Sequence, residues 1–95
     1  MASFNIRVEL KGTPAGEDYE KLHTAMMRAG FSRIIIDDDG VRYHLPPAEY
    51  VGSGDWNASV VQKQVWLIAT SVWKQPAVYV TTAGSRSWRG LKEVG

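Results

Sequence analysis

The sequence contains no cysteine, which excludes disulfides, thiolate metal ligands and cysteine nucleophiles. It also lacks a Gly-rich phosphate-binding loop, a nucleophile elbow and the His–carboxylate spacing of zinc enzymes. Enzyme classes that depend on those motifs are unsupported, and we predict neither a cofactor nor a metal ion. The 95 residues contain no internal repeat and no linker, so they correspond to one domain.

A strong charge of one sign and a long hydrophobic run are also missing. The 11 basic and 10 acidic residues give a net charge of +1, so any nucleic-acid surface has to arise from local placement of charge. The N-terminus has no signal-peptide pattern, and polar residues at 62–64 interrupt the most apolar stretch, residues 60–73. We therefore predict a soluble, cytoplasmic protein without a membrane partner.

What is present is a clear alternation of strand and helix patterns. Residues 4–11 alternate strictly, which predicts a half-buried strand with Phe4, Ile6, Val8 and Leu10 on its core face. Helical spacing predicts helices over 14–29, capped by Thr13 and ended by Gly30, and over 58–74. Further strands are predicted over 31–37, 41–45 and 77–82, a loop over 46–57 and a polar tail over 83–95.

This order of elements predicts a ferredoxin-like α+β domain over residues 1–95. Its four-stranded antiparallel sheet has the order 4-1-3-2, with both helices on one face. The first and third strands are then neighbours at the centre of the sheet. In the tail, Trp88 and Leu91 could anchor a short extra strand.

The stretch "IIIDDDGVRYHL" predicts a hairpin in which the aspartates build the turn and bind no metal. A two-residue turn at Asp39-Gly40 pairs Asp37 with Arg42. The same register pairs Ile36 with Tyr43 and Ile35 with His44, and it directs Ile34 and Ile36 to the core. A longer turn would reverse the faces of one strand.

With this register, Arg42 and His44 lie on the open face of the sheet beside Arg7 and Glu9. Metal-free cleavage of RNA requires a base, an acid and cations that stabilise the charged transition state. His44 and Glu9 are the catalytic candidates, and Arg7, Arg33 and Arg42 are the RNA-binding candidates. The alternative is an exposed histidine among ordinary surface charges. His23 is assigned to packing at the core boundary.

Single-stranded RNA is the predicted partner, and Tyr79 or Trp88 is available to stack on its bases. Trp66 and Trp73 stand one heptad apart on the flank of the second helix. They either close the core edge or form an apolar patch for a homodimer. A non-catalytic protein-interaction or dimerisation module is therefore the alternative function.

The run "RVEL…DYEKLHTAMMRAGFSRIIIDDDGVRYHLPPAEY", from Arg7 to Tyr50, resembles small bacterial proteins grouped with GhoS. GhoS is the endoribonuclease antitoxin of type V toxin–antitoxin systems. The resemblance implies a ferredoxin-like domain, similar in fold to the small CRISPR-associated nuclease, and cleavage of a toxin messenger RNA. Those nucleases place an aspartate near the end of the first strand, where this chain has Glu9-Leu10-Lys11. The endoribonuclease implied here is therefore metal-independent.

Overall fold

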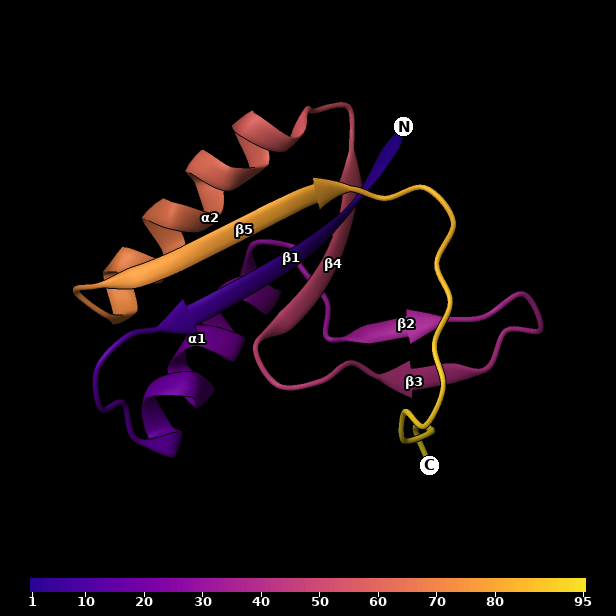
Figure 1. The fold of residues 1–95 in the computed structure, drawn as a ribbon, viewed down its shortest axis with the longest axis horizontal. Helices are drawn as coiled ribbons and strands as arrows, with labels where there is room; N and C mark the ends of the chain where they lie inside the picture. Colours follow the sequence, from indigo (N-terminus) through magenta and orange to yellow (C-terminus); the bar gives the residue numbers. More distant parts are fainter.

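A computed structural model describes residues 1–95 and shows an α+β fold (Figure 1). The elements follow in the order βαβββαβ. They are β1 (Ala2–Leu10), α1 (Gly16–Arg28), β2 (Ile34–Ile36), β3 (Arg42–His44), β4 (Glu49–Gly54), α2 (Ala58–Val72) and β5 (Pro76–Thr82). The strands form one three-stranded and one two-stranded antiparallel sheet. Neither helix has the length and apolarity needed to cross a membrane.

The three-stranded main sheet has the order β4-β1-β5. The alternation predicted for the first strand is confirmed, because all four of its apolar positions are buried: Phe4, Ile6, Val8 and Leu10. Apolar side chains of α1 and α2 belong to the same core cluster as these four. Both helices therefore cover one face of the main sheet, and no helix covers the other (Figure 1).

The predicted four-stranded sheet is wrong, because the neighbour of β1 is β4 and not β3. The strand β4 lies inside the segment predicted as a loop over 46–57. Its glycines suggest turns, but a Cβ on Gly52 would lie 2.6 Å from the Phe31 ring. A Cβ on Gly54 would lie 2.2 Å from the Trp56 ring. These glycines therefore make room for aromatic rings beside a strand.

The hairpin of β2 and β3 forms the second sheet, with a register one residue away from the predicted one. Ile35 pairs with Tyr43, and Ile36 pairs with Arg42. As a result Ile35 is buried, whereas Ile36, predicted to face the core, is 59% exposed. The single-residue shift reverses the faces of β2, as the period of two in a strand requires.

The shift arises from a longer turn than the predicted two-residue one. Oδ1 of Asp37 accepts hydrogen bonds from the amides of Asp39 and Val41, each at 2.9 Å. Gly40 has a φ of 81°, within the left-handed region that glycine adopts without steric cost. The aspartates thus build the turn as predicted. The predicted Asp37–Arg42 ion pair is absent, since the one ion pair in the structure involves the N-terminal ammonium.

The helix α1 begins at Gly16, two residues later than predicted, with Ala15 as its N-cap in place of Thr13. Oδ2 of Asp18 accepts a hydrogen bond of 2.8 Å from the Ala15 amide. The predicted helix end is confirmed, because Gly30 has a φ of 94° after the last turn.

The C-terminal segment, residues 83–95, returns from β5 to the hairpin and crosses in front of it (Figure 1). The His44 amide donates to the Lys92 carbonyl at 2.8 Å, and the Val94 amide donates to the Arg42 carbonyl at 2.9 Å. These bonds form one β-bridge, Tyr43 with Glu93, instead of a full extra strand.

Candidate functional site

The face of the main sheet that no helix covers carries polar side chains and one exposed aromatic ring. Arg7 on β1 lies directly opposite Tyr79 on β5 and Glu49 on β4. Tyr79 is 69% exposed. Directly opposed residues on antiparallel strands have Cβ atoms about 4.5–5.5 Å apart, so the Arg7 and Tyr79 side chains leave the same point of this face.

A cavity of about 360 Å³ lies on this face, which we call the face cavity. The side chains of Arg7 and Tyr79 line it, together with Asn5, Glu49 and Thr81. Arg7 also lines a second cavity, described next. Arg7 is therefore the residue that the two cavities share.

The second cavity, of about 460 Å³, lies at the edge of the main sheet, and we call it the edge cavity. It exists because β4 starts at Glu49, opposite Arg7, so the last residues of β1 have no strand on this side. There the Val8 amide bonds instead to the Ala48 carbonyl at 3.0 Å. The side chains of Arg7, Glu9, Glu20, His23 and Arg33 line this cavity, with Tyr19.

Arg33 brings an unsatisfied charge to the edge cavity. Its Nε atom is buried and has no hydrogen-bond partner. Neither Arg33 nor Arg7 has a carboxylate within 4.0 Å, since the one ion pair in the structure joins the N-terminus to Asp55. Buried polar groups in proteins nearly always have a partner, so this guanidinium carries a donor and a charge that the rest of the chain leaves uncompensated.

His23 forms a wall of the edge cavity and is 8% exposed. Its Nδ1 atom shares a hydrogen bond with the hydroxyl of Tyr50. Burial lowers the pKa of His23, the Arg33 charge lowers it further, and Glu20 acts in the opposite direction. Burial also raises the pKa of Tyr50. Both rings are therefore neutral at pH 7, and the arginines supply the positive charge.

The structure brings together three of the five predicted site residues. Arg7, Glu9 and Arg33 line the edge cavity, whereas Arg42 and His44 do not. The predicted place of Arg42 and His44 beside Arg7 is wrong, because β3 belongs to the second sheet. Both are exposed residues of the hairpin.

The histidine that does line the edge cavity, His23, was assigned by its sequence position to packing at the core boundary. The one sequence signal that could have indicated its setting is Tyr19, four residues earlier on the same helix. The Tyr19 and His23 rings lie with centroids 6.4 Å apart. The third member of the cluster, Tyr50, comes from β4, which the sequence did not predict as a strand.

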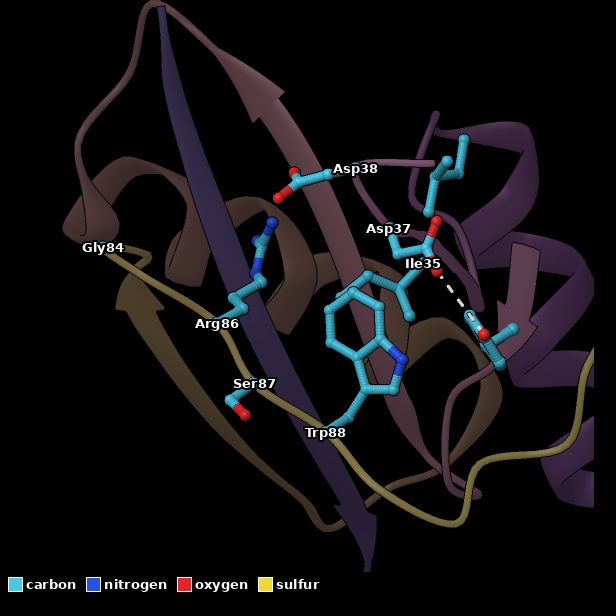
Figure 2. Close-up of a pocket in the computed structure, with 9 residues that line it drawn as sticks. Ile35, Asp37, Asp38, Gly84, Arg86, Ser87 and Trp88 are labelled. Atoms are coloured by element: carbon cyan, nitrogen blue, oxygen red, sulfur yellow. Dashed lines mark hydrogen bonds between the residues drawn. The ribbon is translucent and has the colours of Figure 1, made fainter. Parts of the chain in front are cut away.

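A third cavity, of about 530 Å³, lies between the hairpin and the C-terminal segment (Figure 2). Figure 2 shows Asp38 and Arg86 facing one another across it, with the Trp88 ring beside Ile35. The Trp88 ring also packs edge-on against Tyr43, with centroids 5.9 Å apart. Trp88 thus anchors the C-terminal segment, as predicted.

Arg86 ties the C-terminal segment to the main sheet. Its Nε donates to Oδ1 of Asn5 at 2.7 Å, and its Nη2 donates to the Phe4 carbonyl at 3.2 Å. Asn5 also lines the face cavity. The guanidinium of Arg86 therefore closes one end of the uncovered sheet face, and the edge cavity lies at the other side of Arg7.

The two tryptophans on α2 and just after its end have different surroundings. Trp73 packs against the core cluster, and its Nε1 donates to the Lys11 carbonyl at 2.7 Å. Trp66 is 44% exposed, and the adjacent Leu67 is 70% exposed. Core-edge packing thus describes Trp73, while Trp66 belongs to an apolar surface.

The sequence matches no protein-family model and no curated protein. The structure contains no group of three or more His, Asp or Glu side chains that could hold a metal ion.

Proposed function

We propose that the protein binds single-stranded RNA along the uncovered face of the main sheet. The observation that carries this proposal is the pairing of an exposed aromatic ring, Tyr79, with an arginine that has no carboxylate partner, Arg7. Single-stranded nucleic acids are bound by aromatic rings that stack on bases and by cations that contact the backbone. On this face the two groups leave neighbouring positions, so one nucleotide can contact both.

The surrounding side chains fit an RNA strand better than a protein partner. Asn5 and Thr81 are opposed to each other next to Arg7 and Tyr79, and both line the face cavity. Amide and hydroxyl groups of this kind donate to and accept from base edges and ribose hydroxyls. The apolar side chains beside them, Leu45 and Val51, are half-buried, and Tyr79 is the exposed large apolar side chain of this face.

A ferredoxin-like topology is also part of the proposal, and three strands of the main sheet with both helices support it. Two helices cover one face of a sheet in which β1 is flanked by β4 and β5. An isolated bridge from Ser32 to Val51 continues the pairing beyond β4 on the side where a fourth strand would lie. A short hairpin, β2–β3, replaces that fourth strand.

RNA cleavage, as implied by the resemblance to GhoS, would add chemistry to this binding. Glu9 lines the edge cavity with Arg7 and Arg33, and we assign it the role of acid or base on a phosphodiester bound beside Arg7. His44, the other catalytic candidate, is exposed on the hairpin. An antitoxin-like endoribonuclease is therefore the more specific form of the proposal, and loss of cleavage in Glu9→Gln with RNA binding retained would support it.

RNA binding is tested by fluorescence anisotropy with a labelled single-stranded RNA. Tyr79→Ala is expected to lose about 1–3 kcal/mol of stacking, a roughly 5- to 150-fold drop in affinity, while Tyr79→Phe keeps most of it. Arg7→Gln is expected to weaken binding and to lower the salt slope by about 0.7, the value for one backbone contact in a single strand.

Lys63→Gln is the matched control, because Lys63 is exposed on α2, on the far side of the sheet from Tyr79. It removes one positive charge, as Arg7→Gln does. Equal losses of RNA affinity in Arg7→Gln and Lys63→Gln would show a general effect of charge instead of a site at Arg7. Full affinity in Tyr79→Ala would exclude the sheet face as the RNA site.

The alternative function, a non-catalytic interaction or dimerisation module, is favoured by the exposed apolar side chains of α2. These are Val60, Trp66 and Leu67, which are 46%, 44% and 70% exposed. They lie on the opposite side of the molecule from the face cavity, so the two functions do not compete for one surface.

A further inference from the structure

We propose that the edge cavity binds a terminal phosphate, the phosphomonoester at one end of an RNA strand. This inference rests on the RNA binding proposed above and names the part of the ligand that the edge cavity takes. It assigns a specific role to Arg33, whose side chain lines the edge cavity but not the face cavity.

The first reason is the buried Nε atom of Arg33, which has no hydrogen-bond partner. A guanidinium with an unpaired donor is poorly compensated, and an anion bound in the adjacent cavity would stabilise its charge. Of the residues that line the cavity, the two carboxylates, Glu9 and Glu20, are exposed and lie more than 4.0 Å from any guanidinium nitrogen. No carboxylate of the chain therefore neutralises this guanidinium.

The second reason is the pair of guanidinium groups at one cavity. Arg7 and Arg33 both line it and form no ion pair, and the two carboxylates that also line it, Glu9 and Glu20, are exposed to solvent. A phosphomonoester carries about −1.5 to −2 charges at pH 7 and three strong acceptor oxygens. An internal phosphodiester has a single charge and two unbridged oxygens. Arginine binds phosphate through two parallel N–H bonds, so two arginines match the monoester more fully.

The third reason is the position of the cavity at the end of the sheet face. Arg7 lines both the face cavity and the edge cavity, and Tyr19 and His23 of α1 line the edge cavity. A strand with a base on Tyr79 and a phosphate on Arg7 would end against α1 at the edge cavity. We therefore assign a terminal group to this cavity.

The variant Glu20→Gln is expected to change phosphate binding in the opposite direction from Arg33→Gln. Its carboxylate is exposed and lines the edge cavity. A fixed negative charge there repels the phosphate, so Glu20→Gln is expected to tighten the binding of a phosphorylated strand. A residue with a merely structural role would not produce a gain.

The experiment compares three RNAs of one sequence, with a 5′-phosphate, a 3′-phosphate or hydroxyls at both ends. Wild-type protein is expected to bind one phosphorylated form roughly tenfold more tightly or better than the hydroxyl form, as hydrogen bonds to charged groups allow. Arg33→Gln is expected to lose this preference and to keep its affinity for the hydroxyl form. Inorganic phosphate is expected to compete with the preferred RNA only.

Lys63→Gln, remote on α2, is again the control and keeps the preference. If Arg33→Gln does not fold, Glu20→Gln decides the question, because that exposed substitution leaves the fold intact. Equal binding of all three RNAs by the wild type would overturn the terminal-phosphate site and leave the proposed RNA binding in place. Absence of binding to every RNA would overturn both.

Discussion

His23 ties the stability of this protein to pH, because its ring is buried against Tyr50. Burial lowers its pKa in the folded state, and the charge of Arg33 lowers it further. In the unfolded chain the pKa of histidine returns to about 6.5, so the unfolded state takes up the proton more readily. The free energy of unfolding is therefore highest above that pH, and it falls as the pH drops from about 6.5 toward the folded pKa.

Urea denaturation at about pH 8 and about pH 5 measures this loss. The wild type is expected to lose stability between the two values, and His23→Gln is expected to lose less. His44→Gln serves as the control, because His44 is exposed and its substitution should leave the loss unchanged. An identical pH dependence in wild type and His23→Gln would show that another group governs it.

At the scale of the element, β4 depends on a glycine that holds no turn. A Cβ at Gly52 would lie 2.6 Å and 3.0 Å from two ring atoms of Phe31, which is 3% exposed. Because the Phe31 ring belongs to the core cluster, it cannot move without disturbing its neighbours. Gly52→Ala is therefore expected to destabilise the fold by about 1–3 kcal/mol, the usual cost of overpacking.

Thermal or urea denaturation tests this expectation, with Gly84→Ala as the matched control. A Cβ at Gly84 would meet no atom within 4 Å, so this variant should remain close to the wild type. If both variants have the same stability, the close approach to Phe31 is not what selects glycine at position 52.

Comparison of individual elements shows why local sequence patterns predicted most of this fold but not its sheet pairing. The alternation of β1 and the helical spacing of α2 are properties of each segment alone, and the strand and the helix that they predict are both confirmed. The register of β2 and β3 depends on the hydrogen bonds that Asp37 accepts from the amides of Asp39 and Val41. These bonds lengthen the turn, and the strand pattern alone does not predict them. The strand β4 contains Gly52, which packs against the Phe31 ring from an earlier part of the sequence, and its glycines matched the pattern of a turn.

The candidate site shows the same division. Arg7 and Glu9 were placed correctly on the uncovered face, because alternation along β1 decides their side of the sheet. The pair of His23 and Tyr50 joins residues 27 positions apart and requires β4 beside β1. Sequence spacing contains no signal for that contact, so the sequence favoured His44 over His23.

At the scale of the whole molecule, the chain has two opposite surfaces with different properties. The sheet face carries Arg7, Asn5 and Thr81 around Tyr79, and the outer side of α2 exposes Trp66 and Leu67. Large exposed apolar side chains grouped on one helix commonly mark a protein interface. We therefore predict that the protein self-associates through α2, with the RNA-binding faces of the two copies directed outward.

Sedimentation velocity over a range of protein concentrations measures this self-association. The wild type is expected to shift toward dimer as concentration rises, and the double variant Trp66→Gln, Leu67→Gln to remain monomeric and folded, because both side chains are exposed. Trp73→Phe is the comparison, since Trp73 packs on the core and should matter for stability instead.

Because the sheet face lies away from α2, the double variant should bind a single RNA site with unchanged affinity per chain. Two copies joined at α2 would in turn bind a tandem RNA more tightly than one copy does, through the raised effective concentration of the second site. A wild type that stays monomeric at every concentration would leave RNA binding as the sole proposed function and remove α2 as an interface.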